Sequence, residues 1–411
     1  MSGVSRSVVA GRIGDGRTAF AVLGAISLCH LFNDTMQTLL PAMYPLLRSG
    51  FDLNFVQLGV ITLVFQATGS FLQPLIGRFT DRRPQPYSLP VGMTFTMAGI
   101  LLLASAASYP LLLLGAAAIG IGSSVFHPES SRLARVASGG RFGLAQSLFQ
   151  VGGNLGQSLA PLVVAFFVLP RGRGSLAWVA GLALAGIVLL TALGRWYQAS
   201  GEARPRPRGA LHAPGPLGKR ETRRALAVLI ALIFSKFFYL ASITNFYIFY
   251  LMQRFQLSTT SAQVCLFAFL ASVATGTLVG GPLGDRVGRK YVIWVSILGV
   301  LPFTLLLPYA GLRLTIVLSV VIGLVLSSAF SAILVYGTEL MPGRVGAISG
   351  LFFGLAFGIA GLGAAVLGAI ADWTSIAFVY HLCAFLPLVG LLAFFLPDVG
   401  SEGRTLRSAR A

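Results

Sequence analysis

Long apolar runs separated by short polar links dominate the chain. Twelve runs reach the length of about 20 mostly apolar residues that a helix needs to cross a bilayer, and they cover residues 19–47, 55–77, 87–107, 110–137, 142–169, 175–197, 225–253, 261–283, 290–310, 313–338, 345–371 and 375–397. Backbone polar groups inside lipid must pair within the segment, so runs of this length are predicted to be helices. The pattern therefore predicts an all-α membrane protein with twelve transmembrane helices.

The composition supports lipid as the main solvent of the chain. Of its 411 residues, 55% are hydrophobic and 10% are charged, whereas soluble domains carry about 25% charged residues. The formal net charge of +18 is spread over short loops rather than gathered on one basic face, so nucleic acid is not predicted as a partner. Cys29, Cys265 and Cys383 lie far apart inside apolar runs, without the spacing of a disulfide framework or a metal site.

The basic residues are divided unevenly between the two sets of links. With the N-terminus inside the cell, 24 lysines and arginines fall on the cytoplasmic side and five fall outside, namely Arg48, Arg171, Arg173, Arg254 and Arg313. Lys236 falls inside an apolar run and completes the 30 basic residues. Because positively charged loops stay in the cytoplasm, both termini are predicted to be cytoplasmic, in a bacterial inner (plasma) membrane.

Short motifs recur in the two halves of the chain. Gly-x-x-x-Asp-Arg at 77–82 returns at 281–286, Ser-Ser-x-Phe at 123–126 returns at 327–330, and Gly-Arg-x-Gly at 140–143 returns at 343–346. Three repeats in the same order indicate two related, pseudo-symmetric six-helix halves, as in a transporter class whose binding site lies between the halves. The expected domains are an N-terminal half over 1–197, a Pro-, Gly- and Arg-rich cytoplasmic linker over 198–224, a C-terminal half over 225–397 and a cytoplasmic tail over 398–411.

The loop at 281–290 reads GPLGDRVGRK and resembles the loop signature of the major facilitator superfamily, at the expected place between the second and third helices of a half. The first copy, at 77–84, has Pro84 at the position of Gly288. The resemblance implies a gating role, which we assign to Gly77, Asp81, Arg82, Gly281, Asp285, Arg286, Gly288 and Arg289. The alternative is a basic loop that follows the charge rule alone.

Further segments narrow this resemblance. The segments HLFND at 30–34, FHPESSR at 126–132, QSLFQVGGN at 146–154 and IFSK at 233–236 are similar to the fosmidomycin-resistance branch of the superfamily. The similarity runs from residue 24 or so to residue 398. It implies a secondary active transporter, a proton-coupled antiporter that exports a small anionic drug and uses no cofactor. We expect a functional monomer whose partners are the substrate, protons and membrane lipid.

Two other functions stay open at this point. One is a transporter of an organic phosphate or another small metabolite, which the same anion-binding residues would suit. The other is a membrane-embedded enzyme, although the chain contains neither H-E-x-x-H nor G-x-S-x-G. It also lacks the phosphate loop G-x-x-x-x-G-K-[ST], so an ion gradient or the substrate itself must drive transport.

Asp34 is the first candidate for proton coupling. It falls near the middle of the first span, where an ionisable group costs roughly 2.5–3.5 kcal/mol and burial favours its neutral form. His30, Asp34 and Gln37 share one helix face, and His30, Asn33 and Gln37 are candidate substrate-binding residues. The alternative is a buried aspartate that neighbouring amides satisfy for helix packing.

Glu129 is the second candidate for proton coupling. It follows Pro128, where the fourth span should kink. A Glu129–Arg132 pair that closes one end of the span is the alternative. His127 lies on a different face, as a candidate substrate-binding residue or a satisfied core histidine.

The fifth span carries a polar ladder of amides among glycines. Its members recur about every fourth residue, at Gln146, Gln150, Asn154 and Gln157 or Ser158. Gln150 and Asn154 are candidate substrate-binding residues. Helix packing alone is the alternative, because small residues allow close approach and amides bond across helices.

Lys236 is the candidate anion anchor. It shares a helix face with Tyr239, Tyr247 and Tyr250, and an ammonium with tyrosine hydroxyls suits a phosphonate-like anion. Tyr239 and Tyr247 are therefore candidate substrate-binding residues. The alternative is a structural pair between Lys236 and Asp34; anion binding would then free Asp34 to take a proton, which favours symport over antiport.

Overall fold

The computed structural model of the chain describes residues 18–83, 85–139, 142–200, 217–341 and 345–397. Within these ranges the chain consists of helices, turns and bends, without a β-strand. The expected tail at 398–411 and most of the expected linker lie outside the described residues.

The first half is a bundle of long antiparallel helices. Its elements are α2 (Phe20–Ala42), α3 (Tyr44–Phe51), α4 (Phe55–Arg82), α5 (Ser88–Ser105), α6 (Tyr109–Val136), α7 (Phe142–Val163), η1 (Val164–Val168), α8 (Leu169–Arg171), η2 (Arg173–Ser175) and α9 (Leu176–Ala199). The elements α7, η1 and α8 run on without a break and form one membrane crossing.

The second half repeats this plan. Its elements are α10 (Lys219–Phe255), α11 (Thr259–Val287), α12 (Arg289–Leu298), α13 (Leu301–Leu306), η3 (Leu307–Tyr309), α14 (Leu312–Leu340), α15 (Val345–Trp373), α16 (Ile376–Cys383) and η5 (Leu386–Phe395). The last helix of the first half ends at Ala199 rather than at residue 197, and the first helix of the second half begins at Lys219 rather than at residue 225.

Eleven of the described helical segments are long and apolar enough to cross a membrane. The remaining long helix, α2, is less apolar because it carries His30, Asn33, Asp34 and Gln37, but all four side chains are buried in the bundle. With α2 the chain makes twelve crossings. The sequence-based prediction of an all-α membrane protein with twelve transmembrane helices in two halves is confirmed.

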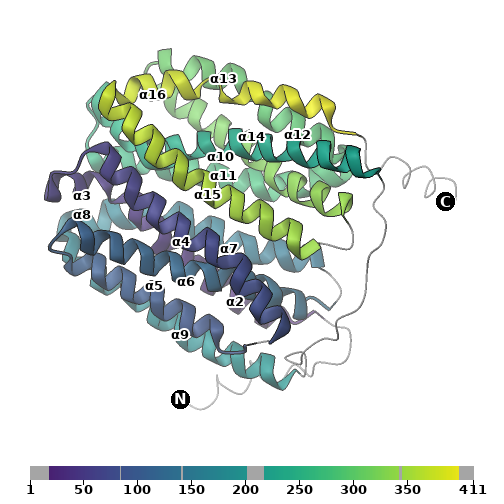
Figure 1. Cartoon of the computed structure of the whole chain (residues 1–411). Coiled ribbons are helices and arrows are strands. Elements are labelled where there is room, and N and C mark those ends of the chain that lie inside the picture. The colour runs from purple at the N-terminus through teal and green to yellow at the C-terminus, as the bar shows by residue number, and fades with distance from the viewer. Residues whose placement is uncertain (1–17, 84, 140–141, 201–216, 342–344, 398–411) are drawn as a thin grey trace.

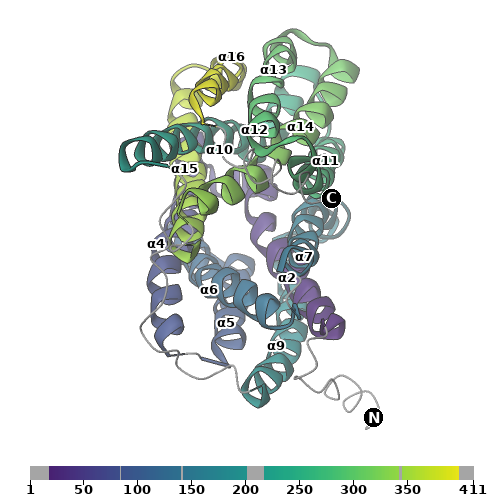
Figure 2. The ribbon, with the colours of Figure 1, turned by 90° about the vertical axis from the view of Figure 1, so that its right-hand side faces the viewer.

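The two halves lie side by side, and two helix pairs form most of the boundary between them. In Figure 1 the purple-to-teal helices of the first half lie below the green-to-yellow helices of the second. Figure 2 shows α4 beside α15 and α7 near α11. Gly59 allows α4 to touch α15, because a side chain at this position would overlap the backbone of Ala364.

Polar contacts between the halves gather toward one end of the bundle. We call the end at which α9 finishes and α10 starts the linker end, and the opposite end the far end. The carboxylate of Asp372, at the end of α15, accepts hydrogen bonds from the backbone N–H groups of Phe55 (3.0 Å) and Val56 (2.7 Å) at the start of α4. Thr62 also donates to the amide oxygen of Asn245, at 2.6 Å. These contacts fasten the halves together at the far end.

Candidate functional site

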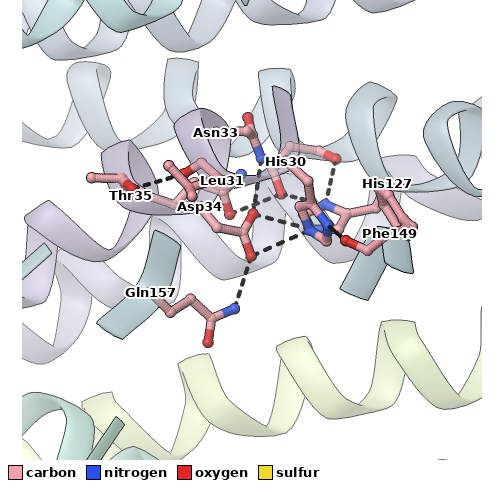
Figure 3. A network of polar contacts seen from close by, with 10 residues as sticks. His30, Leu31, Asn33, Asp34, Thr35, His127, Phe149 and Gln157 are labelled. Atoms are coloured by element: carbon pink, nitrogen blue, oxygen red, sulfur yellow. Dashed lines mark hydrogen bonds and ion pairs between the residues drawn. The ribbon is translucent and has the colours of Figure 1, made fainter. Parts of the chain in front are cut away.

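Asp34 is the centre of a buried polar network in the first half. Its side chain is buried at the middle of α2. The amide nitrogen of Gln157, on α7, donates to its Oδ2 at 2.8 Å, and that of Asn33 donates to its Oδ1 at 3.1 Å (Figure 3). The location expected from the sequence is therefore correct. Gln157, a member of the polar ladder, contacts Asp34 directly, although the expected site did not include it.

Two imidazoles face this carboxylate. His30 Nε2 lies 3.4 Å from Oδ2 of Asp34, and His127 Nε2, from α6, lies 3.5 Å from Oδ1. The three facing atoms lie within 4.8 Å of one another. We call these three residues the His–Asp–His cluster. The sequence placed all three in the site but did not show that α6 brings His127 onto Asp34.

Close packing between α2 and α7 holds His30. Its ring stacks on Phe149, with 4.0 Å between the centroids and 14° between the planes. Its Nδ1 contacts the carbonyl oxygen of Phe149 at 2.8 Å. Gly153 lies against the ring, and a side chain there would overlap it. Gly153, within the polar ladder, thus gives the imidazole its space.

His127 connects the cluster to the second half. Its Nδ1 lies 3.1 Å from the carbonyl oxygen of Ser123, and its ring centroid lies 5.7 Å from that of Phe357 on α15. The ring centroid of Phe353 lies 6.4 Å from that of Phe357, and the ring centroid of Phe330 lies 5.2 Å from that of Phe353. We call Phe330, Phe353 and Phe357 the aromatic row.

Lys236 lies at the other end of the aromatic row. Its ammonium is buried and donates to the carbonyl oxygen of Ser327 at 3.3 Å. It also lies 5.4 Å from the ring centroids of Phe237 and Phe330. Within the described part of the chain no carboxylate forms an ion pair with it, and the ion pairs of Asp34 are with histidines. The alternative of a Lys236–Asp34 pair is not seen in this structure.

The tyrosines that share the Lys236 face do not surround its ammonium. Tyr247 donates to Ser319 at 3.1 Å, and Tyr250 stacks on Tyr380 with 4.2 Å between centroids. Tyr239 is buried near this same group inside the second half. A shared helix face does not fix where long side chains end, because they follow the neighbouring helices. The described rings within cation–π distance of Lys236 are phenylalanines.

Glu129 belongs to a separate ion-pair network. Its carboxylate lies 3.3 Å from Arg132 and accepts a hydrogen bond from Thr80 at 2.6 Å. Arg132 also donates to Thr80 at 3.0 Å. This network joins α6 to α4 toward the linker end, as the alternative interpretation of Glu129 expected. It is directed away from the His–Asp–His cluster, because Glu129 and His127 lie on different faces of α6.

Several amides near the cluster keep unused hydrogen-bonding capacity. Gln37 accepts from Ser123 at 3.3 Å, but its nitrogen is buried without a hydrogen-bond partner among the described residues. The same holds for the side-chain nitrogen of Asn154 and the side-chain oxygen of Asn33. Gln150 is half-buried on α7. Groups of this kind can bind a polar substrate.

The structure describes only part of the expected gating loops. The side chains of Gly77, Asp81, Arg82, Gly281, Asp285 and Arg286 lie outside the described residues. Gly288 adopts a φ of +106° directly before α12, in a region that favours glycine. Arg289 follows it and pairs with Glu339 of α14. These contacts tie the second loop to its own half.

Comparisons with known proteins agree with this architecture. The family model of the Major Facilitator Superfamily matches residues 26–273 and 229–411. Among solved structures, a bacterial homologue of the human lysosomal transporter Spinster, in an inward-facing and occupied conformation, superposes with a TM-score of 0.67 at 16% identity, covering 91% of this chain and 94% of that one. The nucleoside transporter NupG gives a TM-score of 0.66 at 16% identity, covering 91% and 96%.

Two bacterial proteins have higher sequence identity to this chain than those two solved structures. The fosmidomycin resistance protein of Escherichia coli (strain K12) is 59% identical over 383 residues, which is 93% of this chain and 94% of that protein. YfnC of Bacillus subtilis (strain 168), an uncharacterised MFS-type transporter, is 42% identical over 385 residues, again 93% and 94%. The chain is a transporter rather than an enzyme, it is a multi-pass bacterial membrane protein, and it belongs to the fosmidomycin resistance family of the major facilitator superfamily.

Proposed function

We propose that the chain is a proton-coupled antiporter that exports a small anionic drug, such as the phosphonate fosmidomycin, across a bacterial inner membrane. The observation that carries this proposal is Lys236. Its buried ammonium has no carboxylate partner in the described chain, and the aromatic row connects it to the His–Asp–His cluster of the other half.

An anionic substrate follows from the cost of burying a charge. An ammonium removed from water is unfavourable unless it is paired, and one carbonyl oxygen with two phenyl rings compensates it only in part. Phosphonate oxygens are strong acceptors for such a group. The name of the Escherichia coli relative supports the choice of drug.

Proton coupling follows from the cluster around Asp34. A carboxyl group and two imidazoles can gain and lose protons near neutral pH when they are arranged together. They are buried among membrane-spanning helices, and ionisable groups in such segments mark ion pathways. Asp34 is not paired with Lys236 in this structure, so anion binding does not have to free Asp34 to take a proton. That removes the reason for preferring symport, and we therefore favour antiport.

The orientation follows from the basic residues. The five arginines expected outside, at positions 48, 171, 173, 254 and 313, all lie toward the far end of the bundle. We therefore place the linker end and both termini in the cytoplasm. The polar contacts at the far end then close the protein toward the outside. We propose that one chain is sufficient for transport.

Transport by purified protein in liposomes tests the proposal. For antiport, drug must move toward the acidic compartment while protons leave it, so vesicles with an acidic interior should accumulate fosmidomycin. Accumulation driven by an alkaline interior would indicate symport and contradict the proposal. No movement of drug under either gradient would also contradict it. Lys236 suits both a phosphonate and an organic phosphate, so the same experiment is repeated with an organic phosphate. Transport of the organic phosphate without transport of fosmidomycin would favour the second candidate.

A further inference from the structure

The His–Asp–His cluster carries an inference that rests on the proposed proton coupling and makes it more specific. We propose that His30, Asp34 and His127 bind the transported proton as one unit, in which His127 is the member that exchanges it. The sequence assigned proton coupling to Asp34 and treated the two histidines as substrate-binding residues. The geometry joins all three.

The backbone partners fix the hydrogen on one nitrogen of each ring. Nδ1 of His30 lies 2.8 Å from the carbonyl oxygen of Phe149, and Nδ1 of His127 lies 3.1 Å from that of Ser123. A carbonyl oxygen can only accept, so each Nδ1 carries a hydrogen and donates it. The remaining nitrogen, Nε2, then faces Asp34 in both rings.

Each of these contacts favours a further proton on Nε2, although Nε2 of His30 is buried without a hydrogen-bond partner among the described residues. Without one, the lone pair of Nε2 would face a carboxylate oxygen, and the two would repel each other. Nε2 of His30 lies 3.4 Å from Oδ2 and Nε2 of His127 lies 3.5 Å from Oδ1, so a proton on each ring would place opposite charges at both contacts. In the proton-loaded state of this proposal, the unit holds two imidazolium ions and one carboxylate, with a net charge of +1. Loss of one proton to water leaves it neutral.

His127 is better placed than His30 to release that proton. The side chain of His30 is 3% exposed and stacks on Phe149, whereas that of His127 is 14% exposed. Ser123 Oγ also lies 3.2 Å from Nδ1 of His127 and provides a second polar contact on its own helix. His30 therefore acts as the fixed member of the unit, and His127 as the member in exchange with the transport pathway.

Few other ionisable groups on the packed elements lie near the middle of their helices. By sequence position, those of α3, α4 and α9 fall near the helix ends, and α5 and α7 contribute none in their membrane segments. Glu129 is paired with Arg132. The groups that remain at membrane depth are Cys29 on α2 and Lys236, Tyr239, Tyr247 and Tyr250 on α10. Of these, Lys236 is connected to the unit through the aromatic row.

The position of His127 allows its protonation state to affect the packing of the second half. When His127 loses its proton, its attraction to Asp34 falls and the ring can shift against Phe357 of α15. The aromatic row continues from Phe357 through Phe353 to Phe330, which contacts Lys236. The proton site and the anion site are thus joined by a chain of ring contacts rather than by an ion pair.

Nitrogen NMR of the purified full-length protein tests the unit without any transport assay. With ¹⁵N-labelled histidine, both rings should show imidazolium signals at neutral pH, with Nδ1 protonated throughout a titration. The signals are assigned by His30→Gln and His127→Gln. In Asp34→Asn both imidazolium signals should disappear together at that pH. Neutral imidazoles in the wild type, or histidines that titrate independently of Asp34, would overturn the proposal.

Transport by the same variants supplies the second test. His127→Gln should lose drug accumulation driven by the pH gradient while keeping drug–drug exchange. His381→Gln is the matched control, because this histidine also contacts a carbonyl oxygen on its own helix but lies on α16. Unchanged proton stoichiometry in His127→Gln would overturn the unit even though the wild type pumps. Failure of the wild type to pump would instead contradict the proposed function.

Discussion

Nε2 of His127 lies 3.5 Å from Oδ1 of Asp34, and the two residues come from different helices of the first half. This contact explains how a carboxylate can be kept at membrane depth: imidazoles and amides provide its partners, so no lysine or arginine needs to be fixed to it. Lys236 stays available on the other side of the boundary between the halves. In the proposed mechanism, proton and anion therefore have separate sites, one around Asp34 and the other at Lys236.

The first prediction concerns Asp34. Substitution Asp34→Asn removes the negative charge that both imidazoles face, so the unit can no longer cycle a proton. We expect drug accumulation under a pH gradient to fall to the equilibrium level, while drug–drug exchange persists. The exchange rate should also become less dependent on pH between about 5 and 8, the range in which imidazoles change charge. Full gradient-driven efflux by a well-expressed variant would remove Asp34 from the mechanism.

The second prediction concerns Lys236. A buried hydrogen bond to a charged group contributes about 1.5–3 kcal/mol, which corresponds to roughly 10- to 150-fold in affinity. Lys236→Gln should therefore weaken fosmidomycin binding to the purified protein on this scale, as measured by calorimetry. Lys236→Arg should not restore it, because the larger, planar guanidinium directs its donors differently from the compact ammonium.

A control for Lys236 tests the alternative in which this lysine is a structural partner of Asp34. If the lysine were a structural partner of Asp34, Lys236→Gln would lower the yield of folded protein, and adding Asp34→Asn would restore it. Equal affinity of the wild type and Lys236→Gln for the drug would rule out the anchor role. Tyr247→Phe is a useful comparison, because its hydroxyl contacts Ser319 rather than Lys236, and the drug affinity should change little.

The sequence predicted the helices and the two halves because hydropathy and internal repeats depend on short-range patterns. It also placed Asp34 and His30 correctly, since a spacing of four residues puts them on one face of α2. It did not predict that His127 reaches Asp34, because the angle and register between α2 and α6 are set by tertiary packing. For the same reason it did not predict that Tyr247 and Tyr250 contact Ser319 and Tyr380, or identify Phe330 and Phe357; substrate binding by Tyr239 and Tyr247 stays a prediction.

The repeated Ser-Ser-x-Phe motif places a phenylalanine beside a buried ionisable side chain in each half. In the first half Phe126, from the Ser-Ser-x-Phe motif, lies 5.6 Å from the ring of His30. In the second half Phe330, its counterpart, lies 5.4 Å from the ammonium of Lys236. The same motif thus supports a different ionisable group on the first helix of each half. The fold is repeated, but the chemistry at its two equivalent places differs.

The third prediction concerns topology. Reporter fusions at residue 210, in the expected linker, and at Gly172, at the far end, should give opposite signals, with the linker in the cytoplasm. The physical reason is the cost of moving basic loops across the membrane. A reporter active in the cytoplasm and one active outside it should be used at both positions. Matching signals at the two positions would contradict the proposed orientation.

The last prediction concerns the contact between Asp372 and the start of α4. A carboxylate at a helix N-terminus pairs with unbonded backbone N–H groups and with the positive end of the helix dipole. Loss of such a cap costs about 1 kcal/mol, or roughly a fivefold shift in a two-state equilibrium. Asp372→Ala should therefore move the protein toward the conformation that is open at the far end.

Spin-label distances across the far end, measured in liposomes, report this shift directly. Labels on α3 and at the start of α11 should show a larger fraction of long distances in Asp372→Ala than in the wild type. Asp52→Asn is the control, because Asp52 is an exposed carboxylate at the same end, asparagine tolerates its positive φ, and no hydrogen bond joins its side chain to the second half within the described chain. Equal distance distributions in Asp372→Ala and the wild type would show that this contact does not hold the far end closed.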